Sequence, residues 1–277
     1  MSGLQIRKLA GALGAEISGV DLSQALSDQT VAQIRQAFVE HQVIFFRDQN
    51  LTPEQQLAFG RRFGPLNIHP YVAGMPGHPE LMEIVKEPTD KVNFGGGWHS
   101  DMSFLEHPSI GSILYAVEIP EWGGDTLFAS QAAAYDALSP GLKATLETLN
   151  AVHSAGREYS SQGHSAQKRA SMKVVEAEGA VGEFVHPVVK VHPESGRKAL
   201  YVSETFVTRI VELIAWPGEP SREWNRGFLA GIFDAEGSRS AHALRISNTD
   251  AAILSHTMAA LSEFGFDSVL EDLRRPN

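Results

Sequence analysis

Residues 94–104 read FGGGWHSDMSF, and the triplet His99-Ser100-Asp101 within this stretch decides how the rest of the chain is interpreted. Residues i and i+2 of a β-strand point to the same face, so a strand here would aim the His99 imidazole and the Asp101 carboxylate at one point. A neutral nitrogen and an anionic oxygen at one point form half of a ligand shell suited to a divalent first-row metal. The stretch therefore predicts a metal site on a strand.

Composition narrows the possible classes of protein. The chain has 277 residues, no cysteine and a formal net charge of −10 at pH 7. This length suits one large domain, or one domain with a small appendage. The lack of cysteine excludes disulfides, thiolate zinc sites and iron–sulfur clusters, which fits a cytoplasmic location. The acidic charge argues against nucleic acid or an anionic membrane as a partner, and the sequence contains neither a spanning apolar run nor a signal peptide.

Short strands dominate the pattern up to about residue 213. Helices are predicted at 27–42, from Thr52 to Phe63 and at 131–150. Strands are predicted at 4–10, 15–20, 43–48, 81–87, 98–104, 112–120, 125–130, 184–191 and 198–203. Many short strands with few crossover helices predict a mainly β fold with flanking helices, closed as a jelly roll.

The character of the chain changes after Leu213. Residues 214–226 are predicted to be a linker, and residues 227–277 to form a small α/β tail. The tail is predicted to contain a helix at 227–238, a strand at 243–248, a helix at 249–265 and a last strand at 266–273. This order does not continue a jelly roll, so the chain is divided into 1–213, 214–226 and 227–277.

Five separated stretches between about residues 4 and 213 resemble the TauD/TfdA family of Fe(II)- and 2-oxoglutarate-dependent dioxygenases. They are residues 43–66, 69–72, 95–104, 121–130 and 186–213. Together they are far more specific than an isolated His-x-Asp pair. The resemblance implies a double-stranded β-helix, which is a distorted jelly roll with helices packed outside. It also implies an oxidoreductase that uses Fe(II) as cofactor and 2-oxoglutarate as cosubstrate.

The resemblance assigns roles to individual residues. His99 and Asp101 match the first two iron ligands, and Thr126 matches a threonine that binds a carboxylate of 2-oxoglutarate. Positions that line the substrate pocket in taurine-type members correspond to His69, Tyr71 and Phe206. Gly95 stands where taurine dioxygenases have an asparagine that contacts substrate. The predicted substrate is therefore a small anionic or organosulfur molecule, taurine-like or alkylsulfonate-like.

The closing segment of the family is missing from its expected place. It should contain Trp-Asp-Asn-Arg, a distal histidine that completes the metal site, and an arginine about ten residues later that pairs with 2-oxoglutarate. Residues 223–226, Glu-Trp-Asn-Arg, match this motif only in part and lie too early in the chain. His256 is a candidate third ligand by its separation from Asp101, and His242 is a second candidate. The jelly roll is thus predicted to be incomplete on its C-terminal side, with an exposed edge that weakens the core or favours a homo-oligomer.

Residues 228–238, FLAGIFDAEGS, resemble the LAGLIDADG signature of homing endonucleases. The resemblance implies close helix packing through Ala230 and Gly231, and a metal-holding role for Glu236. The tail is about half of one such domain and carries no strongly basic surface. The first interpretation is a dioxygenase by descent that acts on a small molecule. The alternatives are an inactive dioxygenase remnant fused to an endonuclease fragment, and a nucleic-acid enzyme.

The remaining histidines match no metal motif. His186 and His192 precede prolines at strand ends and are predicted to be structural. His107, His153 and His164 are predicted to be exposed to solvent.

Overall fold

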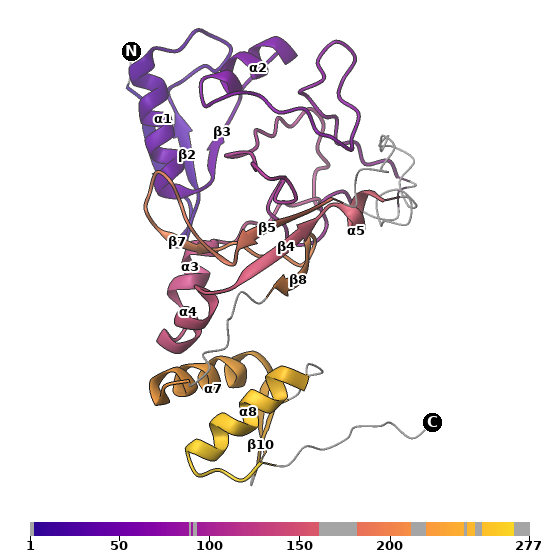
Figure 1. Cartoon of the computed structure of the whole chain (residues 1–277). Helices are drawn as coiled ribbons and strands as arrows, with labels where there is room; N and C mark the ends of the chain where they lie inside the picture. The colour runs from indigo at the N-terminus through magenta and orange to yellow at the C-terminus, as the bar shows by residue number, and fades with distance from the viewer. Residues whose placement is uncertain are drawn as a thin grey trace.

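The computed structural model describes residues 3–88, 90, 93–160, 182–211, 220–240, 243–246 and 251–268. In Figure 1 the elements form three groups from top to bottom: an N-terminal sheet with two helices, a middle sheet surrounded by long connections, and a C-terminal pair of helices with a hairpin. No helix in these ranges is long and apolar enough to cross a membrane.

The N-terminal sheet contains three strands: β1 (Gln5–Lys8), β2 (Ala15–Ser18) and β3 (Ile44–Phe46). β2 lies in the middle, antiparallel to β1 and parallel to β3. α1 (Asp28–His41) buries its predicted apolar face, with Ile34 fully enclosed against Ile17 of β2. Burial of a side chain of this size stabilises a fold by roughly 1.5–3 kcal/mol, so this contact is a main source of stability in the N-terminal third.

α2 (Pro53–Arg61) begins where the sequence predicts. The Gln55 N–H donates to the Thr52 hydroxyl, and the Thr52 N–H donates to Gln55 Oε1 at 2.8 Å. This reciprocal capping box satisfies two backbone donors that the first turn of a helix leaves free, and a cap of this kind is worth about 1 kcal/mol.

The middle group is built on an antiparallel sheet of three strands: β4 (Asn150–Ser154), β5 (Glu183–Pro187) and β8 (Val207–Val211). β4 is the central strand, and a bulge at Val152 and His153 shifts its register against β8. Around this sheet lie the hairpin of β6 (Val189–Val191) and β7 (Lys198–Leu200), and the helices α3 (Gln131–Asp136), α4 (Pro140–Leu146) and α5 (Gly156–Tyr159). The strands predicted at 184–191 and 198–203 are confirmed as β5, β6 and β7, although β7 ends at Leu200. The predicted helical insert is divided into α3 and α4, and β4 and β8 were not predicted.

Four predicted strands are wrong. Residues 81–87, 98–104, 112–120 and 125–130 contain no strand. Among the described residues, no backbone-to-backbone hydrogen bond involves 106–129. Apolar patterning shows that a segment can be buried in a sheet, but a strand forms only where a neighbouring backbone satisfies its N–H and C=O groups. The strands that the structure describes therefore form separate sheets of two or three strands, and their closure into one jelly roll is not seen.

The unpaired stretch 106–129 carries large apolar side chains in solvent. Leu114, Val117, Ile119, Trp122 and Leu127 are between 66% and 88% exposed. Single exposed apolar residues are common, but a concentrated series along an extended backbone resembles an unprotected sheet edge. Residues 106–129 therefore present an unpaired apolar backbone, whereas the edge predicted on the C-terminal side of the jelly roll stays a prediction.

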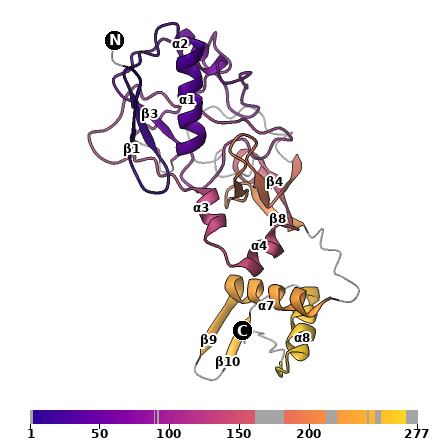
Figure 2. The ribbon, with the colours of Figure 1, turned by 90° about the vertical axis from the view of Figure 1, so that its left-hand side faces the viewer.

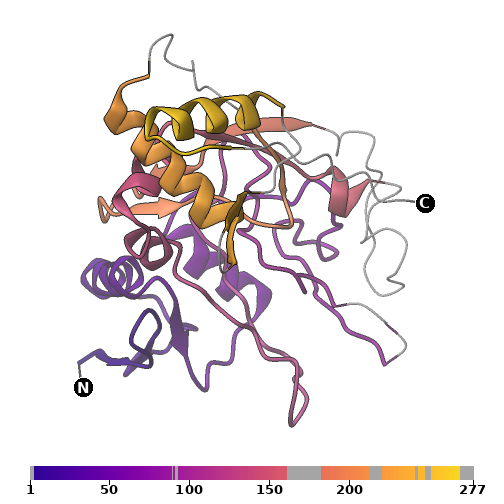
Figure 3. The same ribbon diagram turned by 90° about the horizontal axis from the view of Figure 1, so that it is seen from below.

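The C-terminal group contains four elements: α7 (Arg222–Glu236), β9 (Gly237–Ser240), β10 (Ala243–Ile246) and α8 (Ala251–Glu263). β9 and β10 form a hairpin, which Figure 2 shows, and α8 packs on α7, as Figures 2 and 3 show. The two predicted helices and the strand at 243–248 are confirmed, whereas β9 was not predicted. α7 starts inside the predicted linker. No strand forms at 266–268, and the remainder of the last predicted strand lies outside the described residues.

α7 also packs against α4, through a contact between two glycines. A Cβ atom added to Gly141 would lie 3.3 Å from the Cα of Gly227 and 3.4 Å from the Cβ of Ala230. Larger side chains would separate the two helices. The small residues of the signature-like helix thus face a helix of the middle group, so the tail is attached to the rest of the molecule by packing as well as by the chain (Figure 2).

Replacing Val117 and Ile119 with lysine tests whether the unpaired stretch causes self-association. Both side chains are exposed, so folding should be unaffected. We expect the concentration at which oligomers appear to rise by about tenfold, since each factor of ten corresponds to about 1.4 kcal/mol of lost contact. Sedimentation velocity over a concentration series measures this. Val191→Lys, an exposed apolar residue of β6, is the matched control, and equal behaviour of all three proteins would contradict the prediction.

Candidate metal centre

His99 and Asp101 lie together, although not on a strand. The His99 Nε2 and Asp101 Oδ1 atoms are 3.1 Å apart, with 27% and 53% of the two side chains exposed. Residues 98–100 have no regular structure and 101–104 form a turn. The strand predicted at 98–104 is therefore wrong, but the convergence of the two side chains is right.

A glycine beside the pair lets the imidazole take this position. Gly95 has φ +66°, and a Cβ atom there would lie 3.1 Å from Cε1 of His99. Any side chain at residue 95 would be strained and would also crowd the imidazole. A larger side chain at residue 95 would therefore displace the His99 ring.

Each donor atom is oriented by a second hydrogen bond. His99 Nδ1 lies 2.8 Å from the carbonyl oxygen of Gly97. Because a carbonyl only accepts, Nδ1 carries the hydrogen, and the lone pair of the neutral ring is on Nε2. Ser112 Oγ donates to Asp101 Oδ2 at 2.5 Å, which leaves Oδ1 facing the imidazole. Hydrogen-bond partners of this kind orient metal ligands. Here they direct the two candidate metal-binding atoms, His99 Nε2 and Asp101 Oδ1, toward each other.

The two side chains alter each other's titration. The hydrogen bond with Asp101 raises the pKa of His99 above its ordinary value, against the effect of burial, and the carbonyl of Gly97 and the charge of Glu158 act in the same direction as Asp101. The same contact lowers the pKa of Asp101, with a further contribution from Ser112. Without metal, a proton on Nε2 thus occupies the space between the two donor atoms over an extended pH range.

Aromatic rings pack beside this pair. The ring of Phe206 meets the His99 ring edge-on, with centroids 6.1 Å apart, and Phe104 lies 4.9 Å from Phe206. Tyr71 and Tyr159 stack at 5.4 Å. The aromatic cluster comprises His69, Tyr71, Phe104, Tyr159 and Phe206. The structure therefore brings the three predicted pocket residues into one group beside His99, while their binding role stays a prediction.

His69 is the polar member of the aromatic cluster. Burial lowers its pKa to about 4, although the charge of Asp101 acts in the opposite direction. The ring is therefore neutral at pH 7. Its Nδ1 accepts a hydrogen bond from the Tyr71 N–H at 3.1 Å, so the ring hydrogen is on Nε2. His69 can thus donate a hydrogen bond to an anionic oxygen without carrying a charge.

Other predicted site residues do not join the pair. Thr126 is exposed in the unpaired stretch and hydrogen-bonds to neither His99 nor Asp101. His256 lies on α8, and no group of three His, Cys, Asp or Glu side chains that could hold one metal ion is found in the described ranges. His242 lies outside those ranges. The described part of the chain therefore brings together the two predicted ligands His99 and Asp101, and their role in metal binding stays a prediction.

Sequence reasoning missed several residues of the site. Phe104 lies in the opening motif, and its alternation with Met102 was a usable signal. Tyr159 and Ser112 match no motif, because they reach the site only through the fold. His153 was predicted to be exposed, yet it is 1% exposed on β4, so that prediction is wrong. His107 is exposed as predicted, and His164 lies outside the described residues.

Comparison with known proteins supports the resemblances. A family model described as taurine catabolism dioxygenase TauD, TfdA family matches residues 5–245. This chain belongs to the TauD/TfdA family. A second family model, described as a LAGLIDADG-like domain, matches residues 223–276 and overlaps the end of the TauD/TfdA match. Both resemblances inferred from the sequence are confirmed.

Individual relatives of this TauD/TfdA chain are longer than the part they share with it. An alkylsulfatase of Acinetobacter baylyi is 40% identical over 207 residues, covering 73% of this chain and 64% of that protein. An alpha-ketoglutarate-dependent sulfonate dioxygenase of Saccharomyces cerevisiae is 34% identical over 221 residues, covering 76% and 52%. The solved structure of a taurine dioxygenase from Burkholderia xenovorans matches with a TM-score of 0.62 and 37% identity, covering 76% and 66%. The chain thus spans between half and two thirds of the length of these proteins.

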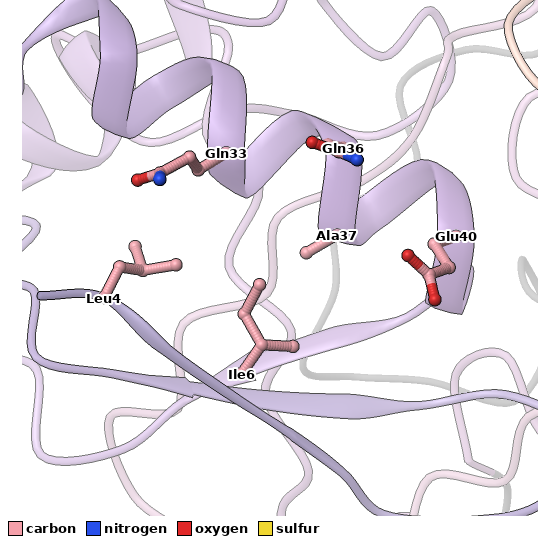
Figure 4. Close-up of a pocket in the computed structure, with 6 residues that line it drawn as sticks. All are labelled: Leu4, Ile6, Gln33, Gln36, Ala37 and Glu40. Atoms are coloured by element: carbon pink, nitrogen blue, oxygen red, sulfur yellow. The ribbon is translucent and has the colours of Figure 1, made fainter.

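Two cavities lie outside the aromatic cluster. One of about 410 Å³ is lined by Gly97, Arg157, Glu158, Glu204 and Thr205. One of its lining residues, Gly97, accepts the hydrogen bond from His99 Nδ1. The other, of about 210 Å³, lies between α1 and β1, where Leu4, Ile6 and neighbouring side chains point into it (Figure 4). Neither is lined by His99, Asp101 or a member of the aromatic cluster.

The pKa shifts predict how pH affects the TauD/TfdA pair. Divalent metal must displace the proton on His99 Nε2, whose pKa is raised, so Mn(II) affinity should fall by about tenfold per pH unit below that pKa. The metal-free ion pair behaves in the opposite way: its contribution to stability is complete below the unfolded pKa of histidine and is lost as pH rises through the raised pKa. At the acid end it is lost as pH falls through the lowered pKa of Asp101.

Isothermal titration with Mn(II) at pH 6, 7 and 8 measures the first effect. Asp101→Asn should abolish binding. His78→Gln is the matched control, because His78 and Glu54 form a surface pair with the same 3.1 Å separation. Equal affinity at the three pH values would rule out His99 Nε2 as a ligand.

Proposed function

We propose that this chain is, by descent, an Fe(II)- and 2-oxoglutarate-dependent dioxygenase that hydroxylates a small organosulfur anion, such as an alkylsulfonate or a sulfate ester. Family membership supports the reaction class, and the names of the sulfonate dioxygenase and alkylsulfatase relatives support the substrate class. We further propose that activity is reduced, because the described residues supply two of the three protein ligands that such a site needs.

The separation of 3.1 Å between His99 Nε2 and Asp101 Oδ1 carries the proposal. Two ligand atoms bound at right angles, each about 2.1 Å from a metal, stand about 3 Å apart. The pair is thus spaced as neighbouring ligands of one octahedral ion, and its donor set of imidazole and carboxylate fits Fe(II). The hydrogen bonds with Gly97 and Ser112 hold both donors in that arrangement.

The residues around the pair have defined tasks in this proposal. Iron chelated by 2-oxoglutarate supplies the oxidising chemistry when bound, and hydroxylation beside the sulfur-bearing group lets the product break apart. His69 donates its Nε2 hydrogen to an anionic oxygen of the substrate. Tyr71 and Phe206 exclude water from the space beside His99, which strengthens that hydrogen bond. Thr126 remains the proposed contact of a 2-oxoglutarate carboxylate, and this contact requires residues 125–130 to move toward the pair.

The proposed fold follows the same descent. We take residues 1–213 as a double-stranded β-helix that is incomplete on its C-terminal side, joined through 214–226 to a LAGLIDADG-like fragment at 227–277. The separate sheets of the middle group and the unpaired stretch 106–129 support an incomplete barrel. The cytoplasm stays the proposed location because the chain lacks cysteine.

An alternative function is favoured because the described residues supply no third ligand. In this alternative the chain is an inactive remnant that binds metal weakly, since affinity follows the number of ligands. A nucleic-acid enzyme is opposed by the net charge of −10 and the short tail. Binding of DNA that weakens with rising salt would favour it over both other interpretations.

Anaerobic titration with Fe(II), followed by 2-oxoglutarate, separates the first two functions. A bound 2-oxoglutarate chelate of Fe(II) absorbs visible light by charge transfer. We expect a saturable band that is lost in His99→Ala. The control His192→Ala alters an exposed histidine and should keep the band. No band from folded wild-type protein would establish the inactive remnant instead.

A further inference from the structure

The turn that carries Asp101 is held by few backbone bonds of its own. Ser103 N lies 3.4 Å from the Ser100 carbonyl, and the Leu105 N–H donates to the Met102 carbonyl at 3.0 Å. Met102 has φ +57°, a left-handed conformation that is unfavourable for a residue other than glycine. Such a conformation persists only where surrounding contacts fix it, so groups outside the turn must hold it.

Two buried histidines of the middle sheet contact this turn. His153 of β4 places Nδ1 3.1 Å from Ser103 Oγ, and His186 of β5 places Nε2 2.8 Å from the Leu105 carbonyl oxygen. The two histidines are 1% and 6% exposed, and Ser103 is 1% exposed. Because a carbonyl only accepts, His186 is the donor and carries its hydrogen on Nε2. The turn is therefore tied to two adjacent strands of one sheet.

The two rings also support each other. They meet edge-on with centroids 5.1 Å apart, and Tyr201 stacks on His153 at 5.3 Å. The ammonium group of Lys190 lies over the Tyr201 ring, with Nζ 4.2 Å from the ring centre. Burial lowers the pKa of His153 to about 4 and also lowers that of His186. Both rings are neutral at pH 7, so their hydrogen bonds to the turn do not change in the physiological range.

Packing alone gives a weaker account of these residues. A buried imidazole costs free energy unless it is hydrogen-bonded, and apolar side chains would fill the same space without that requirement. Each histidine instead directs a ring nitrogen to the turn, two and four residues after Asp101. Ser103 itself and Phe104, which lies between Ser103 and Leu105, are almost fully buried. The contacts fix the backbone immediately after the metal ligand.

We infer that His153 and His186 are positioning residues of the metal centre, which hold Asp101 against His99 by anchoring Ser103 and Leu105. They take the place of the strand pairing that residues 98–104 lack. The inference rests on the proposed function for its effect on metal binding. The effect of the two histidines on the turn itself does not depend on metal. An experiment can therefore distinguish failure of this inference from failure of the proposed function.

The central comparison is His186→Leu with His186→Gln in the full-length protein. Glutamine can present an N–H near the position of Nε2, whereas leucine keeps volume and removes the donor. We expect Mn(II) affinity to fall about 10- to 100-fold in His186→Leu, the range typical for lost outer partners of metal ligands, and to stay within about threefold in His186→Gln. Ser103→Ala is a second variant of small volume change, and it should shift affinity in the same direction. His192→Leu is the control.

Hydrogen exchange followed by mass spectrometry gives the readout that does not depend on metal. Peptides that contain residues 98–105 should exchange faster in His186→Leu and Ser103→Ala, while peptides from β4 and β8 stay protected. Unchanged exchange and affinity in both variants would overturn the inference. Equal losses in the leucine and glutamine variants, with faster exchange throughout the sheet, would overturn it as well by showing a general folding role. If wild-type protein binds no Mn(II), the proposed function fails, and the exchange data alone decide the inference.

Discussion

The pairing of β4 with β5 on one side and β8 on the other is the constraint on which the candidate site depends. β4 supplies His153, and its last residue donates a backbone hydrogen bond to the carbonyl of Phe206 at 2.9 Å. Tyr159 follows directly in α5, and His186 stands on the neighbouring strand. A strand that is paired on both sides has no free edge and cannot slip without losing two sets of hydrogen bonds. The residues attached to β4 therefore keep their places although the surrounding sheets are not joined.

Patterns within short stretches of sequence correctly predicted the helices α1 and α2, whose formation depends on residues close together in the chain. The capping box at Thr52 and the 3.6-residue period through Ile34 involve residues within one turn or one helix, and both were right. The strand at 112–120 was wrong for a different reason. Its apolar pattern describes which side chains could be buried, but whether a partner strand exists is decided elsewhere in the chain. No window of sequence contains that information.

The same distinction applies to the site. His99 and Asp101 are two residues apart, so both a strand and a turn can bring their side chains together, and the prediction succeeded with the wrong element. His69 and Phe206 were found by matching separated motifs. Thr126 was matched in the same way, but its position depends on a sheet that the structure does not form. His153 and Ser112 could not be found, because a single histidine or serine has no local sign of what it will contact. A third metal ligand could not be identified for the same reason, since it must come from a distant segment of the chain.

The glycine contact between α4 and α7 changes how the tail should be regarded. A chain joined by chance to foreign sequence would carry that sequence as an attached appendage, yet here Gly227 and Ala230 fit against Gly141. The tail is therefore part of the folded molecule, and its small residues serve an intramolecular contact.

The unpaired stretch 106–129 has a consequence for the life of the protein in a cell. Proteases and chaperones bind extended, accessible segments of a chain, and most proteins expose such segments only after local or global unfolding. This chain already presents such a segment in its folded state, with apolar side chains that chaperones bind. Cleavage within 106–129 would therefore require no global unfolding, and a more stable core would not protect this stretch.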